Sequence, residues 1–213
     1  MRISKLSESA GLPVGTVKFY LRSGLLHAGR ATSATQAQYD DSHLARLRLI
    51  RALLEVGGLA LADIQRVLDA IDLPTDDTAR SVALVHSALV PGDDCDADLA
   101  TSREAVSGLG WSIDPESTAL IPLARALEAL ASVGVEVPPE RLRVYADSAF
   151  HAARADLHAV EEVAAEDKAV VAGTAPLVDA LIISLRRLAA EHQLAQSAQQ
   201  PAVPVPRLTF PGA

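Results

Sequence analysis

Two basic and two aromatic residues stand together in the segment TVKFYLRSGLL, at positions 16 to 26. The chain has three Phe, three Tyr and one Trp in all, so the pair Phe19 and Tyr20 between Lys18 and Arg22 is unusual. Lys and Arg neutralise phosphates, and neighbouring hydroxyl and amide groups add directional hydrogen bonds. A solvated helix with half-buried rings would show the same residues. The segment alone leaves both interpretations open.

The acidic segment DDCDAD places Asp94, Asp96 and Asp98 at the first three ligand positions of a calcium loop. Such a loop requires glycine at its sixth position and glutamate at its twelfth, where this chain has Leu99 and Ala105. We therefore interpret the segment as a solvated acidic loop.

Cys95 is the single cysteine, which excludes a disulfide framework and any multi-cysteine metal site. A redox or metal-sensing thiol is a second interpretation of Cys95. Its acidic neighbours argue against that interpretation, because they disfavour the reactive thiolate. His151 and His158 are two helical turns apart, roughly 10.5 Å, too far for one metal ion. Phosphate-binding loops and nucleophile elbows are absent from the sequence. We expect no enzyme, no cofactor and no metal site.

Local signals predict a helix-turn-helix around the opening segment. Ser4 is a plausible N-cap for a first helix that ends at Gly11. Pro13 sets up a second helix over 14–23, ended by Gly24. Its inward residues are predicted to be Val14, Val17 and Leu21, at helical spacing. Thr16, Phe19, Tyr20 and Arg22 are then predicted to lie on the outer side, with Lys18 at the margin.

A polar segment at 27–39 predicts a short strand pair or loop, a wing. Two further helices are predicted at about 41–56 and 60–71, with wide apolar faces and Gly57-Gly58 between them. Another helix is predicted at 76–90, before the acidic loop.

The segments MRISKLSESAGLPVGTVKFYLRSGLL and QYDDSHLARLRLIRALLEVGGLALADIQRVL, with their spacing, resemble the MerR family of winged-helix transcription regulators over residues 1–72. The resemblance implies that the second helix enters the major groove and that the wing grips phosphates. It also implies dimers that twist or bend a promoter so that RNA polymerase can read it. The implied DNA-contacting residues are Thr16, Lys18, Phe19, Tyr20 and Arg22 on the helix and Arg30, Gln36 and Tyr39 in the wing.

This sequence departs from the family pattern at several positions. Lys18 stands where the family often has Arg, which keeps the charge but loses the forked geometry. Leu21 stands where it often has an acid. The wing has Thr35, Gln36 and Ala37 where Gly-Tyr-Arg is common, so Arg30 is left as the candidate phosphate clamp.

Charge is unevenly distributed along the chain, whose net charge is -8. Residues 1–51 carry 8 basic and 3 acidic residues, whereas residues 73–213 carry 10 basic and 20 acidic ones. A phosphate surface attracts the basic end and repels the acidic body. The sequence therefore predicts a basic module oriented toward nucleic acid.

The remaining chain predicts an all-helical body, giving a mainly α fold. We divide the chain into a winged helix-turn-helix DNA-binding domain (1–72), a connecting helix and acidic loop (73–98), an all-helical dimerisation and effector domain (99–195) and a Pro-rich flexible tail (196–213). The apolar face of 178–188 is expected to join two copies. Pro122 is expected to kink its helix and open a pocket for an apolar small molecule near Trp111 and Tyr145; alternatively, Trp111 plugs the core and the body only dimerises.

The sequence thus predicts a cytoplasmic, homodimeric transcription regulator that binds double-stranded promoter DNA. It has no signal peptide and no run of 18 apolar residues, so no membrane partner is expected. The alternative is a non-catalytic binding protein that sequesters a ligand or a partner protein.

Overall fold

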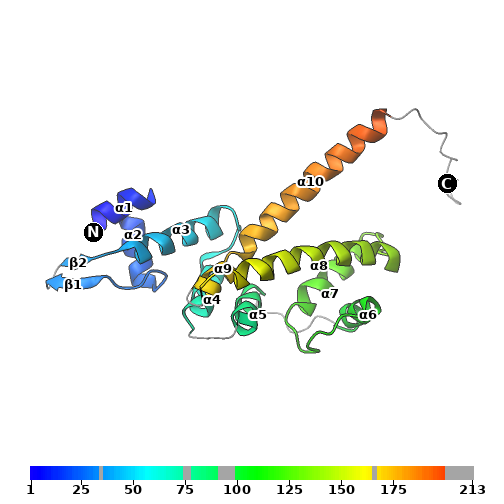
Figure 1. Ribbon diagram of the computed structural model, residues 1–213, viewed down its shortest axis with the longest axis horizontal. Coiled ribbons are helices and arrows are strands. Elements are labelled where there is room, and N and C mark those ends of the chain that lie inside the picture. The colour runs from blue at the N-terminus through cyan, green and yellow to red at the C-terminus, as the bar shows by residue number, and fades with distance from the viewer. Residues whose placement is uncertain (34–35, 74–77, 91–98, 165–166, 200–213) are drawn as a thin grey trace, which may run out of the picture.

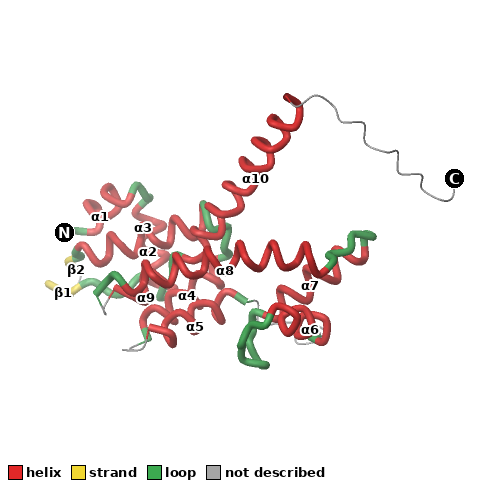
Figure 2. Tube along the Cα trace, turned by 45° about the vertical axis from the view of Figure 1, so that its right-hand side comes forward, coloured by secondary structure: helices red, strands yellow, loops and turns green. Residues whose placement is uncertain are grey.

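The computed structural model describes residues 1–33, 36–73, 78–90, 99–164 and 167–199. These residues are mainly helical, with one two-stranded hairpin (Figure 2). The predicted mainly α fold, a helix-turn-helix followed by a helical body, is confirmed. The predicted acidic loop with Cys95, and the chain beyond Gln199, lie outside the described residues.

The N-terminal third contains α1 (Ile3–Ala10), α2 (Val14–Ser23), β1 (Arg30–Ser33), β2 (Gln36–Gln38), α3 (Asp41–Glu55) and α4 (Leu61–Asp72). The bounds of α2 are those predicted. The predicted N-cap of α1 is wrong, because Ser4 lies inside the helix and Arg2 holds the cap position. The reason is that two hydrogen bonds to Tyr39 hold Met1 in place just before the helix. The Met1 carbonyl accepts from the backbone N–H of Tyr39 at 2.8 Å, and the Met1 ammonium group donates to the Tyr39 carbonyl.

The body contains α5 (Thr78–Leu89), α6 (Ala100–Leu109), α7 (Leu120–Ser132), α8 (Pro139–Glu161), α9 (Lys168–Ala172) and α10 (Ala175–Gln199). Pro122 was expected to kink its helix, but it is the third residue of α7. The N–H groups of the first turn have no intrahelical acceptor, so proline costs little there and α7 begins normally. Helix α10 continues to Gln199, beyond the predicted start of the tail at 196.

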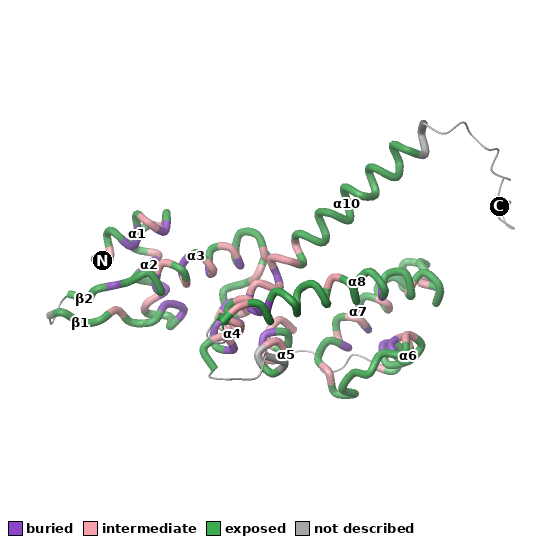
Figure 3. The backbone as a smooth tube through the Cα atoms, viewed as in Figure 1, coloured by how far each residue is buried: buried purple, intermediate pink, exposed green. Residues whose placement is uncertain are grey.

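One hydrophobic core joins the N-terminal elements to part of the body. It includes residues of α1–α5 and continues into the end of α8 and into α9 (Figure 3). Its fully buried members are Leu6, Val17, Leu47, Ile50, Leu53, Ile64, Val67, Leu68 and Val85. The core therefore runs across residue 72, where the sequence predicts a domain boundary.

A second, smaller set of buried residues holds α6, α7 and α8 together. Its buried apolar members are Val106, Leu120, Ala124 and Ala146, which lie outside the main core cluster. The guanidinium of Arg143 on α8 donates to the carbonyl of Gly108 on α6 at 3.0 Å. This helical unit lies at the end of α8 away from the hairpin (Figure 1).

Helix α10 leaves the body as an arm (Figure 1). Its first turns contact the rest of the chain, whereas every residue from Leu181 to Gln196 is exposed. By length and composition alone, the helical segment Lys168–Gln196 would be able to cross a membrane, with mean hydropathy 1.6 and 17% of its apolar window buried. An exposed apolar helix of this kind requires a covering surface.

The lack of a side chain at Gly29 lets the loop before the hairpin pack closely on the end of β2 and on Tyr39. A Cβ atom there would lie 2.7 Å from the Gln38 carbonyl oxygen and 2.8 Å from the Tyr39 ring. We predict that Gly29→Ala lowers the free energy of unfolding by about 1–3 kcal/mol, measured by urea denaturation, because the contact forces a shift of the packed hairpin.

The matched control is Gly108→Ala, because a Cβ at Gly108 in α6 meets nothing within 4 Å. This substitution should stabilise the chain by about 0.5–1 kcal/mol through the higher helix propensity of alanine. Equal stability of Gly29→Ala and the parent would show that the hairpin does not need this close approach.

Candidate nucleic-acid interface

A tight turn sets the angle between α1 and α2. Gly11 ends α1 with φ 65°, a left-handed conformation that glycine adopts without strain. The Ser7 hydroxyl donates to the Leu12 carbonyl, and the N–H of Leu12 donates to the Ser7 carbonyl at 3.0 Å. Pro13 is the N-cap of α2. The turn is thus closed by its own side chain and backbone, which holds α2 at a fixed orientation to α1.

Helix α2 has a buried side and an exposed side. Val17 is fully buried and Tyr20 is 5% exposed. The prediction that Tyr20 lies on the outer side of the helix is therefore wrong, because its ring belongs to the core. The reason is its spacing, because Tyr20 lies one helical turn after Val17 and shares its face.

Lys18, Phe19 and Arg22 lie on the exposed side of α2. The Phe19 ring is 42% exposed and leans on Tyr20, with ring centroids 5.7 Å apart. Thr16 is half-buried at the edge of this face. Within the described part of the chain, no ion pair involves Lys18 or Arg22, so both charges face solvent without a protein partner. This arrangement offers two cations and an apolar ring to one ligand surface.

The hairpin follows α2 in the chain and carries polar side chains. Strands β1 and β2 are antiparallel, with Arg30 opposite Gln38. The Arg30 guanidinium donates to the Gln38 side-chain oxygen at 3.3 Å, and Gln36 is exposed. Tyr39, predicted to contact DNA, is 9% exposed and belongs to the core. Arg30 and Gln36 thus remain available to a ligand, whereas Tyr39 anchors the hairpin.

Residues 1–71 match the sequence pattern of the MerR HTH family regulatory proteins. The HTH-type transcriptional regulator MerD of Pseudomonas aeruginosa is 38% identical over 99 residues, which are 46% of this chain and 80% of MerD. MerD of Acinetobacter calcoaceticus is 44% identical over 72 residues, 33% of this chain and 60% of that protein. A crystal structure of a putative transcriptional regulator from Streptomyces coelicolor A3(2) matches with TM-score 0.65 and 30% identity, over 95% of this chain and 100% of that one.

This chain belongs to the MerR family. It is therefore a DNA-binding transcription regulator of the helix-turn-helix type. The match to the two MerD proteins covers less than half of this chain, so they say nothing of α10.

In this MerR-type chain, Asp40 organises the junction between the hairpin and α3. Its Oδ1 accepts from the N–H groups of Ser42 and His43 at 3.1 and 3.4 Å, and from the Ser42 hydroxyl at 2.6 Å. The Asp40 N–H donates in return to His43 Nδ1 at 3.2 Å, which completes a capping box. Hydrogen bonds from Ser42 and His43 hold the pKa of the Asp40 carboxyl well below its usual range. Sequence analysis missed this role, although Asp before a helical segment is an N-cap signal.

His27 completes this cluster from the loop after α2. Its ring lies 3.9 Å from the buried His43 ring, centroid to centroid, and its Nε2 lies 3.0 Å from the Ser42 hydroxyl. Ligand atoms of His27, Asp40 and His43 all lie within 4.8 Å of one another, a spacing that a metal ion tolerates. Hydrogen bonds already engage Oδ1 of the Asp40 carboxylate, so we interpret the cluster as a structural cap.

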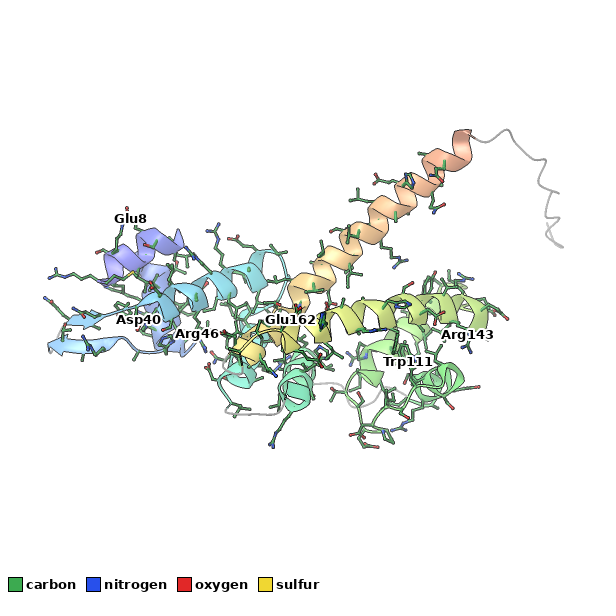
Figure 4. All side chains as sticks on the ribbon, viewed as in Figure 1. Glu8, Asp40, Arg46, Trp111, Arg143 and Glu162 are labelled. Carbon is green, nitrogen blue, oxygen red and sulfur yellow. The ribbon has the colours of Figure 1, made fainter. Side chains whose placement is uncertain are left out.

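Arg46 ties the MerR-type elements to each other from α3 (Figure 4). Its Nε donates to the Leu25 carbonyl at 2.6 Å, and its two terminal nitrogens donate to the Asp72 carboxylate at 2.7 Å each. The side chain of Arg46 is 12% exposed. This forked contact joins the loop after α2 to the end of α4, so Arg46 is a positioning residue and not a phosphate ligand.

The three residues predicted to line an effector pocket are all exposed in the structure. Trp111 is 39% exposed in the loop after α6, and Tyr145 is 48% exposed on α8, where the Arg186 guanidinium lies 5.8 Å from its ring centroid. Pro122 is exposed in the first turn of α7. The apolar cavity of this protein is lined by other residues, on α5, α8, α9 and α10.

The imidazole cluster predicts a pH dependence of stability. Burial lowers the pKa of His27 below its ordinary 6.5, and the nearby charges of His43 and Arg46 lower it further. The unfolded chain thus takes up a proton before the folded chain does, so stability is full above pH 6.5 and falls below it. We expect the melting temperature to decrease as the pH falls from 7 toward 5, and His27→Gln to reduce that decrease.

His151→Gln, on α8 and outside the cluster, is the control and should keep the parent's pH dependence. If His27→Gln and His151→Gln gave the same curves as the parent, the histidine cluster would not account for the effect.

Proposed function

We propose that this chain is a homodimeric, cytoplasmic transcription regulator. It binds promoter DNA through α2 and the hairpin, with RNA polymerase as a further partner at the promoter. One observation carries the DNA part: Lys18, Phe19 and Arg22 share the exposed face of α2, and among the residues that the structure describes neither cation has an ion-pair partner. Lys and Arg neutralise phosphates or read guanine edges, and an exposed apolar ring suits a thymine methyl group. Arg30 and Gln36 extend the surface along the hairpin.

The dimer part is supported by the pattern of apolar residues on α10. Val178, Leu181, Leu185 and Leu188 follow one another at intervals of three, four and three residues. This alternation is the seam of a coiled coil, in which each such residue packs between residues of a facing helix. The three leucines are 56%, 55% and 59% exposed in the single chain. A second copy of α10 covers such a seam better than lipid does, because Arg186 and Arg187 lie inside the segment.

A regulatory body also requires an input, and we infer that it is a small molecule bound between the helices. The predicted site near Trp111, Pro122 and Tyr145 consists of three exposed residues, so we place the input at the apolar cavity of α5, α8, α9 and α10 instead. The alternative function, sequestration of a ligand or partner protein without DNA binding, would leave the exposed cations of α2 without a role.

Removal of the exposed cations tests the DNA part. Lys18→Ala and Arg22→Ala should each weaken binding to duplex DNA and reduce the salt dependence of log K by about one. Both side chains are exposed, so unfolding should change by less than about 0.5 kcal/mol. Fluorescence anisotropy at several salt concentrations measures both quantities.

Arg154→Ala, an exposed cation on α8, is the matched control and should bind DNA as the parent does. Parental affinity and salt slope in both α2 variants would mean that α2 is not the DNA-binding helix. Absence of DNA binding by the parent at low salt would favour the sequestration function.

Charges placed on the seam test the dimer. Leu181→Glu and Leu188→Glu should convert the dimer to a monomer at micromolar concentration in sedimentation equilibrium, because they bury carboxylates in the interface. Leu194→Glu is the control, since Leu194 is 71% exposed on the same helix and lies off the seam. A monomeric parent, or seam variants that remain dimeric, would contradict the interface.

A further inference from the structure

The cavity between α5, α8, α9 and α10 has a volume of about 230 Å³. It is lined by Val82, His86, Ala153, Asp156, Leu157, Ala159, Val160, Val171, Ala172, Thr174, Ala175 and Val178. Segments far apart in sequence thus meet here, at the end of α8 that adjoins α9 (Figures 1 and 2). An apolar cavity of about 150 Å³ suffices for benzene in another protein, so this one admits a slightly larger compact molecule.

The lining has a buried apolar floor and an exposed mouth. Val160 and Ala172 are buried, at 4% and 6% exposure, whereas Ala153, Asp156 and Leu157 on α8 are exposed. A ligand therefore enters past α8 and places its hydrocarbon part against valine and alanine side chains. Small side chains from all four helices leave the space open, because none of them reaches across it.

One carboxylate and one imidazole, those of Asp156 and His86, line the cavity. Asp179 lies outside the lining, where partial burial raises its pKa, the charge of His86 lowers it and the charge of Asp156 raises it. The carboxylates of Asp156 and Asp179 are therefore close enough to repel. A ligand cation beside Asp156 would relieve that repulsion, whereas a ligand anion would increase it.

We propose that this cavity binds a compact lipophilic amine, with its hydrocarbon body on Val160 and Ala172 and its ammonium group beside Asp156. The cavity is smaller than the usual 300–1,000 Å³ or so of a drug-sized site, which favours a single ring with a short cationic arm. That its occupation regulates transcription rests on the proposed function.

The cavity is connected to the DNA-binding elements through α9 and the start of α10. Just after the lining residue Ala172, Gly173 packs so closely on α4 that a Cβ there would lie 2.4 Å from the Ile71 side chain. Pro176, two residues before Val178, lies 3.3 Å from a Cβ placed on Gly57, in the turn between α3 and α4. A ligand that shifts α9 therefore presses directly on α4 and on that turn.

Three probes with the same ring separate shape from charge: cyclohexylmethylamine, cyclohexylmethanol and cyclohexanecarboxylate. We expect titration calorimetry of the full chain to show millimolar binding of the amine, weaker binding of the alcohol and none of the carboxylate. Asp156→Asn should weaken amine binding up to about fivefold, the range of a partly exposed ion pair. Asp147→Asn, also on α8 and outside the cavity, should not.

Ala153→Leu fills the mouth and should abolish binding of the amine, whereas Ala149→Leu, one turn earlier on the exposed face, should retain it. Both positions are exposed, so both variants should fold. Equal affinity for all three probes would overturn the role of Asp156. Lack of amine binding, or equal binding by the two leucine variants, would overturn the site itself.

DNA binding provides a separate readout. If the amine binds but leaves the DNA affinity of the parent unchanged, the link through α9 is overturned and the binding site stands. If the parent fails to bind duplex DNA at all, the proposed function falls while the calorimetry still decides on the cavity.

Discussion

The packing of α3 and α4 is the constraint on which the other elements depend. Leu47, Ile50 and Leu53 of α3 are fully buried, and so are Ile64 and Leu68 of α4. On one side this core receives α1, α2 and the hairpin, and on the other it receives α5 and α9. Interiors are close-packed, so the direction of the exposed α2 face follows from how Val17 and Tyr20 of α2 pack in this core.

Two tyrosines show how packing in this core positions the proposed binding surface. Tyr20 enters the core from α2, and Tyr39 enters it from the end of the hairpin. Their rings use large apolar areas to hold in place the two elements of the proposed DNA interface. Helix geometry then places three residues on the outer side of α2: Lys18, Phe19 and Arg22. The residues proposed to contact DNA and those that position them are thus neighbours in sequence with opposite environments.

Much of the N-terminal fold was predictable because its signals are local. Pro13 and Gly24 mark the ends of α2 through backbone conformation, which needs no knowledge of the partner helices. The inward side was harder: Val14, predicted inward, is 36% exposed, because the first residue of a helix has no preceding turn to pack beside. Tyr20 was assigned outward because a tyrosine, apolar with a polar tip, suits either environment.

The cavity was not predictable, for a different physical reason. Trp111 attracted the prediction because it is large and rare, but it is 39% exposed in the loop after α6. The cavity is lined mainly by alanine and valine from four helices, and these residue types carry no local signal of a void. A cavity arises where small residues from distant segments fail to fill the space between them, and that is a property of packing rather than of any one segment.

Helix α10 brings these features into a single element. Its first turn touches the α3–α4 turn through Pro176 and Gly57. Val178 lines the cavity and also begins the heptad spacing that continues through Leu181 and Leu188. A helix is stiff along its axis because each turn is hydrogen-bonded to the next. A displacement at the cavity therefore moves the start of the arm and its seam together. Because each exposed leucine gains about 1.5–3 kcal/mol when it is fully covered, pairing of two arms would fix their relative direction, and with it the spacing of the two α2 helices on DNA.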